Sequence, residues 1–180
     1  MIKKKVLIIS SSPRKQSNLE ILCDEFMKGA REAGNSVEKL RIADMNITFC
    51  SGCDECTKYQ RSCPQNDDIA LVEKKMIEAQ VIVLATPTYF YMMSGQMKTF
   101  LDRACSYYQK MQDTEFYYIV TCSDDRRRVI DDVVNGFRGF AHCIDGAVEK
   151  GIIYATDVWE MGDVKTKEAM EQSYEMGKKV

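Results

Sequence analysis

The sequence is poor in proline, histidine and tryptophan, and it lacks long hydrophobic runs. It holds 3 prolines, 1 histidine and 1 tryptophan among 180 residues. A single histidine excludes a metal site built on two imidazoles, and we expect His142 to be structural. The apolar run Val6 to Ile9 is too short for a signal peptide, and no later run approaches the length of a membrane span. We therefore expect a cytoplasmic protein.

A charge excess of either sign is also missing. The chain has 25 lysines and arginines against 27 aspartates and glutamates, a formal net charge of −2. This balance offers no electrostatic case for nucleic acid or an anionic membrane as a partner. The length suits one domain, residues 1–180, with one sizeable core. The 8 cysteines are abundant by contrast. In a reducing compartment they favour metal binding, redox chemistry or burial over disulfides.

Hydrophobic patterns predict strands and helices that alternate along the chain. The expected strands are 6–9, 37–42 (at a sheet edge), 81–85, 115–122 and 152–155, and the expected helices are 18–33, 67–79, 95–107, 128–148 and 164–178. Alternation of this kind predicts an α/β fold, with a parallel sheet covered by helices on both faces. Ligands of such sheets bind beyond the carboxyl ends of the strands. We therefore expect loops 10–17, 86–94 and 122–125 to converge on one ligand.

The turn between the first strand and the first helix contains no glycine, so it fits neither the dinucleotide fingerprint nor the nucleotide-triphosphate loop. It does contain Ser12, Arg14, Ser17 and Asn18, which offer short hydrogen-bonding side chains and a positive charge beside a helix N-terminus. Because a helix N-terminus attracts anions, this turn suits a phosphate. The alternative is that Ser17 or Asn18 only caps the helix.

A polar and aromatic loop follows the predicted strand 81–85. It consists of Thr86, Pro87, Thr88, Tyr89, Phe90 and Tyr91. Flat side chains and backbone amides at a strand end suit a planar heteroaromatic ring. The alternative is a loop that covers the core or contacts another subunit. A phosphate turn combined with a ring platform suggests a mononucleotide ligand.

A long loop, residues 45–68, carries half of the cysteines. Cys50, Cys53, Cys56 and Cys63 follow a spacing that resembles the cysteine motif of bacterial ferredoxins, which favours a [4Fe–4S] cluster. Zinc sites usually pair two separated cysteine knuckles, which makes zinc a weaker alternative. The four side chains can also pack or stay free thiols. The cysteines that fall in predicted helices are expected to be buried: Cys23, Cys105 and Cys143.

Two groups of charges remain. The run 126–128 is three arginines beside the third ligand-facing loop, where it could meet the 2′-phosphate of a nicotinamide cofactor or form a solvated face. Lys98, Asp102 and Arg103 are expected to form exposed or subunit-facing pairs that contribute little to stability.

In this order and spacing, the motifs resemble the NADPH-dependent FMN reductase group of the flavodoxin-like fold, and within it the iron–sulfur flavoproteins. They are residues 11–14 with 17–18, the four cysteines followed by 67–68, then 87–89, and finally 94–95 with Lys98, Asp102 and Arg103. The sequence departs from the family pattern at Ser11, at Leu19 and in the acidic third loop around Ser123.

The resemblance implies a three-layer sandwich with a five-stranded parallel sheet of order 2-1-3-4-5. It implies FMN, with its phosphate on Ser12, Arg14, Ser17 and Asn18 and its ring along Pro87, Thr88, Tyr89, Phe90 and Tyr91, with Ser123 beside it. A [4Fe–4S] cluster on the four cysteines would exchange electrons with the FMN. NAD(P)H or ferredoxin would be the electron donor, a small molecule or protein the acceptor, and the assembly a homodimer or homotetramer.

We therefore hypothesise an FMN-dependent oxidoreductase in which the flavin is the reactive group and no side chain acts as nucleophile or base. Backbone N–H groups near Tyr89–Tyr91 are expected to stabilise the reduced ring. The alternatives are a cluster-free NAD(P)H-dependent FMN or quinone reductase, and a non-catalytic flavodoxin-like redox carrier.

Overall fold

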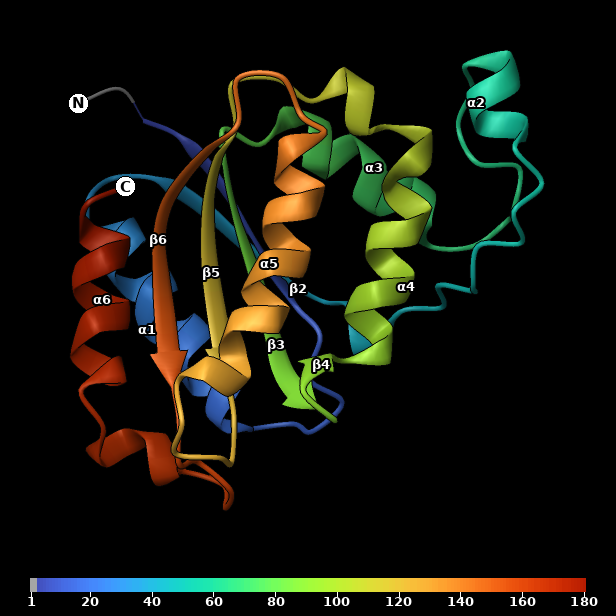
Figure 1. Ribbon diagram of the computed structural model, residues 1–180. Helices are drawn as coiled ribbons and strands as arrows, with labels where there is room; N and C mark the ends of the chain where they lie inside the picture. The colour runs from blue at the N-terminus through green and yellow to red at the C-terminus, as the bar shows by residue number, and fades with distance from the viewer. Residues whose placement is uncertain (1–2) are drawn as a thin grey trace.

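A computed structural model describes residues 3–180, and its centre is a twisted sheet of parallel strands (Figure 1). The strands run β1 (Lys5–Ser10), β2 (Ser36–Arg41), β3 (Val81–Tyr89), β5 (Glu115–Thr121) and β6 (Val148–Ala155), in the spatial order β2-β1-β3-β5-β6. This is the predicted order 2-1-3-4-5 once the short strand β4 (Met92–Met93) is set aside. β4 pairs antiparallel with the end of β3 and was not predicted.

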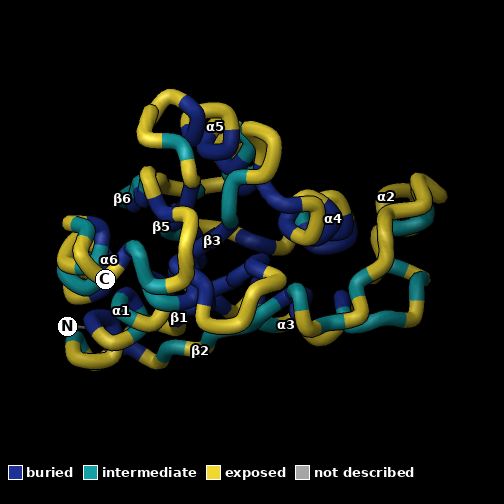
Figure 2. The backbone as a smooth tube through the Cα atoms, turned by 90° about the horizontal axis from the view of Figure 1, so that it is seen from below, coloured by how far each residue is buried: buried dark blue, intermediate teal, exposed yellow. Residues whose placement is uncertain are grey.

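Helices cover both faces of the sheet, as Figure 2 shows. α1 (Asn18–Glu32) and α6 (Ala169–Lys178) lie on one face, and α3 (Ile69–Glu78), α4 (Gly95–Arg103) and α5 (Arg128–His142) lie on the other. The five-residue helix α2 (Glu55–Tyr59) stands away from the sheet in Figure 1. Short 3₁₀ turns complete the chain at Ile42–Asp44, Ala104–Ser106, Tyr108–Lys110 and Asp163–Thr166.

The two faces of the sheet bury two separate apolar clusters. In β1 the side chains of Leu7 and Ile9 pack toward α3 and α4, and those of Val6 and Ile8 pack toward α1. Successive side chains of a strand point to opposite faces, so a strand buried on both faces needs apolar residues without alternation. The unbroken runs of β1 and β3 meet that need. β2 lies at an edge, as predicted, and none of its residues is fully buried.

α1 and α6 cross at two glycines. A Cβ atom built on Gly29 would collide with the backbone of Tyr174, and one on Gly177 would collide with the backbone of Phe26. The two helix backbones therefore approach more closely than any larger residue would allow. This crossing holds the C-terminal helix against the helix that begins at the predicted phosphate turn.

Several element boundaries differ from the prediction. The helix predicted over 95–107 ends at Arg103 and continues as 3₁₀ turns, and the helix predicted over 128–148 ends at His142. β6 then starts at Val148, four residues earlier than expected, because its first residues pair with β5 from Glu115 onward. The predicted helix 164–178 begins as a 3₁₀ turn and becomes α-helical only at Ala169.

Three predictions about burial are wrong. Cys105 and Cys143 are exposed, whereas Cys23 is buried as expected. Both exposed cysteines lie beyond the observed ends of α4 and α5, in a 3₁₀ turn and at the cap of α5, so helical spacing does not describe them. Arg103 was expected on the surface, but its side chain is fully buried and paired with Asp67. Lys98 and Asp102 form the exposed pair that was expected.

Among the described residues, none of the helices combines the length and the apolar character needed to span a membrane.

Candidate functional site

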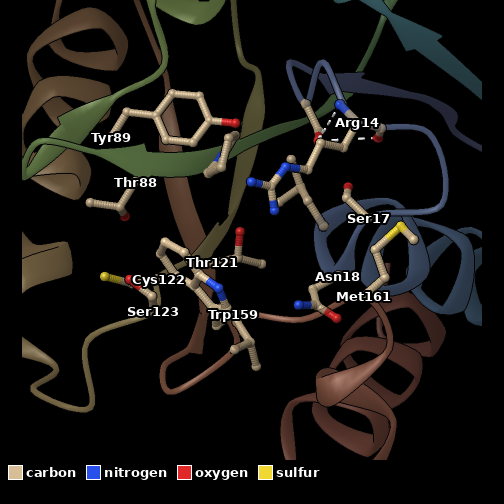
Figure 3. Close-up of a pocket in the computed structure, with 14 residues that line it drawn as sticks. Arg14, Ser17, Asn18, Thr88, Tyr89, Thr121, Cys122, Ser123, Trp159 and Met161 are labelled. Carbon is tan, nitrogen blue, oxygen red and sulfur yellow. Dashed lines mark hydrogen bonds between the residues drawn. The ribbon is translucent and has the colours of Figure 1, made fainter.

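A cavity lies at the carboxyl end of the parallel strands, where the three predicted loops converge (Figure 3). It encloses about 190 Å³ and opens to solvent. Its walls come from the turn after β1, the end of β3, the loop after β5 and the loop after β6. The lining residues are Ser12, Arg14, Ser17, Asn18, Leu19, Pro87, Thr88, Tyr89, Thr121, Cys122, Ser123, Val158, Trp159 and Met161.

The turn after β1 delivers a helix N-terminus to this cavity. Ser17 is the N-cap of α1, and its hydroxyl oxygen accepts a hydrogen bond from the Glu20 backbone N–H at 3.3 Å. The hydroxyl hydrogen of Ser17 is not used in that bond, so capping and phosphate binding are compatible. Arg14 is exposed, and Figure 3 shows its guanidinium extending toward the middle of the cavity. An unpaired set of backbone N–H groups, a hydroxyl and a guanidinium together suit a phosphate group.

A buried charge network supports this turn from below. The Glu20 carboxylate is buried and accepts from Lys39 at 2.9 Å and from Arg41 at 2.9 Å, and it also receives the hydroxyl of Ser10. Arg41 donates a further hydrogen bond to the carbonyl oxygen of Ser12 at 3.2 Å. The backbone of the turn is therefore fixed before any ligand arrives, which lowers the ordering cost of binding.

Asn18 makes a different set of contacts from those that the sequence suggested. Its amide nitrogen donates to the carbonyl oxygen of Glu160 at 2.8 Å, and its amide oxygen accepts from the backbone N–H groups of Gly162 at 2.9 Å and Val164 at 3.3 Å. The side chain thus binds the loop after β6. Its predicted contact with phosphate stays a prediction.

The end of β3 forms the opposite part of the cavity. Pro87, Thr88 and Tyr89 line it, and Figure 3 shows the Tyr89 ring at its upper wall. The hydroxyl of Thr88 is buried and has no hydrogen-bond partner within residues 3–180. Because buried hydroxyls are normally paired, this atom is suited to a ligand that offers a hydrogen-bonding edge. Phe90 and Tyr91 do not line the cavity.

Phe90 and Tyr91 instead form the tip of a tight hairpin between β3 and β4. Both have positive φ angles, 46° and 64°. Their side chains are exposed, 98% for Phe90 and 56% for Tyr91. Their predicted contact with a flavin ring stays a prediction, while their backbone lies directly beside Tyr89.

The loop after β5 closes the third side. Ser123 lines the cavity together with Thr121 and Cys122. Asp124 then folds the loop back by accepting hydrogen bonds from the backbone and the guanidinium of Arg126, and these bonds hold the pKa of Asp124 below its usual range. In the run 126–128, Arg127 stacks on the ring of Tyr154 at 3.8 Å. The predicted contact of the run with a 2′-phosphate stays a prediction.

The fourth wall of the cavity was not predicted from the sequence. Val158, Trp159 and Met161 come from the loop after β6, which lies at the same edge of the sheet as the other three loops. The rule that ligands bind beyond the carboxyl ends of parallel strands applies to this loop too, so the signal was available. The predicted strand 152–155 ends just before these residues.

The four cysteines of the 45–68 segment are not gathered into one site. Cys50 and Cys53 are exposed, and Cys56 and Cys63 are partly buried. Within residues 3–180, no three His, Cys, Asp or Glu side chains lie close enough together to hold a metal ion. The thiols are the ligands that an iron–sulfur cluster takes, but their arrangement does not fit a cluster as it stands.

Cys63 and Cys56 have other neighbours. The sulfur of Cys63 accepts a hydrogen bond from the buried Arg103 at 3.3 Å. Thr57 lies between Cys56 and Cys105, with its hydroxyl 3.6 Å from the Cys105 sulfur. Burial, followed by the nearby Cys105 thiol, raises the pKa of Cys56.

Arg103 joins the two ends of this segment. It donates to both carboxylate oxygens of Asp67, at 2.7 and 3.0 Å, and to the carbonyl oxygen of Thr48 at 2.7 Å. Burial alone would raise the pKa of Asp67, but the hydrogen bonds from Arg103 and Thr48 outweigh it and hold this pKa below its usual range. The cysteine-rich segment therefore leaves and rejoins the fold at one buried ion pair.

The sheet order, the helices on both faces and a cavity at the carboxyl edge define a protein of the flavodoxin-like fold. Solved structures agree. An NAD(P)H:quinone oxidoreductase from Methanothermobacter marburgensis aligns with a TM-score of 0.75 and 14% identity over 98% of this chain and 96% of that one. The azoreductase AzrA aligns with a TM-score of 0.73 and 12% identity over 98% of this chain and 100% of that one.

Residues 4–144 match the family model described as NADPH-dependent FMN reductase, and the chain belongs to this family. An iron–sulfur flavoprotein of Methanocaldococcus jannaschii is 39% identical over 100 residues, which are 56% of this chain and 51% of that protein. One from Archaeoglobus fulgidus is 35% identical over 103 residues, 57% of this chain and 46% of that protein. The aligned part spans about half the length of these curated relatives.

Proposed function

We propose that the protein is an FMN-dependent oxidoreductase. The observation that carries the proposal is that the turn after β1 and the end of β3 line one cavity, so that Ser12 and Tyr89 face the same space. The turn after β1 offers a helix N-terminus and Arg14. The end of β3 offers an aromatic wall and the hydroxyl of Thr88, which has no hydrogen-bond partner among residues 3–180. FMN has the matching chemistry, a phosphate at one end and a planar heteroaromatic ring at the other. Membership of the NADPH-dependent FMN reductase family supports the same ligand.

Bound FMN would supply the redox chemistry itself, accepting and releasing hydride or single electrons at its ring. The side chains of this chain bind and orient it. Arg14 and the N-terminus of α1 hold the phosphate, while Tyr89 packs on the ring and Thr88 hydrogen-bonds its edge. Backbone N–H groups of the hairpin tip at Tyr89–Tyr91 stabilise negative charge on the ring. No nucleophile or general base is needed.

We propose NAD(P)H as the electron donor, with a small molecule or a protein as the acceptor; the family supports the nicotinamide donor. A homodimer or homotetramer is supported by the apolar side chains exposed beside the cavity. Phe90 is 98% exposed, Tyr91 56% and Met92 51%, and a patch of this kind is typical of a surface that another chain covers. The cytoplasmic location stays a prediction.

The cysteine-rich segment supports a second, finer proposal, that Cys50, Cys53, Cys56 and Cys63 bind a [4Fe–4S] cluster. The spacing of the four thiols and the names of the relatives support it. Because the described arrangement does not bring the thiols together, loading must move the exposed part of the segment. Anaerobically purified protein should then contain about four iron and four sulfide per chain. Protein with bound FMN and no iron would support the alternative, a cluster-free FMN or quinone reductase.

The main proposal is tested by FMN binding and turnover together. Apoprotein titrated with FMN should bind one flavin per chain, and the loaded protein should oxidise NADPH or NADH when a quinone or excess FMN is present. The control is an Arg14→Gln variant, which removes the charge at the phosphate end and should need more FMN for the same rate. Bound flavin without oxidation of either nicotinamide would point to a redox carrier. Failure to bind FMN would overturn the proposal.

A further inference from the structure

The loop after β6 contributes the only tryptophan of the chain to the cavity. Val158 is buried in the core at the start of this loop, while Trp159 is 66% exposed at the rim of the cavity. The match to the family model ends at residue 144, so this wall lies outside the matched part of the chain. Figure 3 shows Trp159 and Tyr89 entering the cavity from opposite sides.

Asn18 holds this loop in place from the N-terminus of α1. It donates to the carbonyl oxygen of Glu160 at 2.8 Å and accepts from the backbone N–H groups of Gly162 and Val164 at 2.9 and 3.3 Å. Both acceptor positions of its amide oxygen and one of its two amide N–H donors are therefore used by the loop. Asn18 is buried, so these bonds are shielded from competing water.

Asp163 fixes the same loop from its other end. One carboxylate oxygen accepts hydrogen bonds from the backbone N–H groups of Trp159 at 2.9 Å and Glu160 at 2.7 Å. The backbone of Trp159 is thus held at a set position although its side chain is largely exposed. An uncovered aromatic side chain that a fixed backbone carries at a cavity rim is suited to covering a ligand.

We propose that Trp159 is a ring-binding wall opposite Tyr89, and that Asn18 is a positioning residue that acts through Trp159. This inference rests on the proposed binding of FMN and adds to it. The ring is then enclosed by two aromatic side chains, one from each side of the cavity. The phosphate end is formed by Arg14 and the N-terminus of α1.

Comparing the affinities for FMN and riboflavin separates the contribution of the ring end of the cavity from that of the phosphate end, because riboflavin has the ring and lacks the phosphate. Flavin fluorescence measures both affinities. A Trp159→Leu variant should bind each flavin about tenfold more weakly, since it loses aromatic stacking on the ring. Asn18→Ala should weaken both flavins by a similar factor. Arg14→Gln should weaken FMN and leave riboflavin unchanged, and Lys165→Ala, exposed on the same segment, should change neither.

Asp163→Ala is the second test of the positioning role. Asp163 does not line the cavity, so it cannot touch a phosphate there, and its loss should reproduce the Asn18→Ala pattern. It also keeps the proposal testable if Asn18→Ala fails to fold, which circular dichroism will show. In the wild-type protein, emission from Trp159 should fall as FMN saturates the site, and the one tryptophan makes this signal unambiguous.

Two results would overturn the inference while leaving FMN binding intact. The first is an Asn18→Ala variant that loses affinity for FMN but binds riboflavin normally, which would make Asn18 a phosphate ligand. The second is tryptophan emission that does not change when FMN saturates the protein. A wild-type protein that binds neither flavin would overturn the proposed function and this inference together.

Discussion

Replacing Arg103 by methionine tests the buried ion pair that joins the cysteine-rich segment to the fold. The side chains of Arg103 and Asp67 are 0% and 3% exposed. Methionine keeps much of the volume and removes every donor, so Asp67 stays buried without its counter-ion and the carbonyl of Thr48 loses its partner. Breaking a buried pair in this way costs about 3–5 kcal/mol of the free energy of unfolding. That is a large share of the roughly 5–15 kcal/mol that stabilises an ordinary domain.

The same helix offers a matched control. Lys98 and Asp102 form an ion pair whose side chains are 60% and 47% exposed. Exposed pairs of this spacing contribute about 0.3–0.5 kcal/mol, because water screens them. Lys98→Met should therefore change the free energy of unfolding by less than about 1 kcal/mol. Arg103→Met should lower it several times more.

Urea unfolding followed by circular dichroism measures both variants against the wild-type protein. We expect a clear fall in the midpoint for Arg103→Met and almost none for Lys98→Met. A double variant, Arg103→Met with Asp67→Asn, should recover part of the loss because no charge is left buried. Equal midpoints for the two single variants would refute a stabilising buried pair at Arg103 and would support the exposed pair that the sequence suggested.

Three further outcomes follow from the structure. The pKa of Asp67 in the folded protein lies below its unfolded value of about 3.9, so the stability from its pairing with Arg103 is present above that pH and is lost as the pH falls below it. When the free energy of unfolding is measured against pH, Asp67→Asn should lack this acid-dependent loss of stability. Gly29→Ala should lower the melting temperature, because the new Cβ meets the backbone of Tyr174; an unchanged melting temperature would contradict the close helix crossing. Iodoacetamide should label Cys143 quickly in the folded protein and spare Cys23, whose burial raises its pKa; mass spectrometry of the digest decides.

Local pattern was enough to predict the sheet and its ligand edge. The short, β-branched apolar runs of β1 and β3 favour buried strands, and alternation with helices leaves few topologies, so the convergence of the turn after β1 with the end of β3 could be predicted. The β3–β4 hairpin was missed for a physical reason. Its tip is Phe90 and Tyr91 at positive φ, where glycine or asparagine is expected, so the sequence carries no turn signal there.

The remaining errors concern contacts between distant residues. Arg103 sits on the same helix face as the buried Phe100, and its charge suggested solvent, because its partner Asp67 is 36 residues away and cannot be read from local spacing. The contacts of Asn18 with the loop after β6 were missed for the same reason, because these partners lie far away in the sequence, while its predicted contact with a phosphate stays a prediction. Pairings of this kind depend on how the elements pack, and the local pattern does not record them.

The most direct test of the account is equilibrium dialysis of the apoprotein against FMN, with the Arg14→Gln and Tyr89→Ala single variants and their combination. We expect one FMN per chain and a weaker site when either the phosphate end or the ring end is changed. The losses of binding free energy should add in the double variant, because the two ends contact separate parts of the ligand. FMN that binds equally well to the wild-type protein and to the double variant would contradict it, since the flavin would then occupy another part of the molecule.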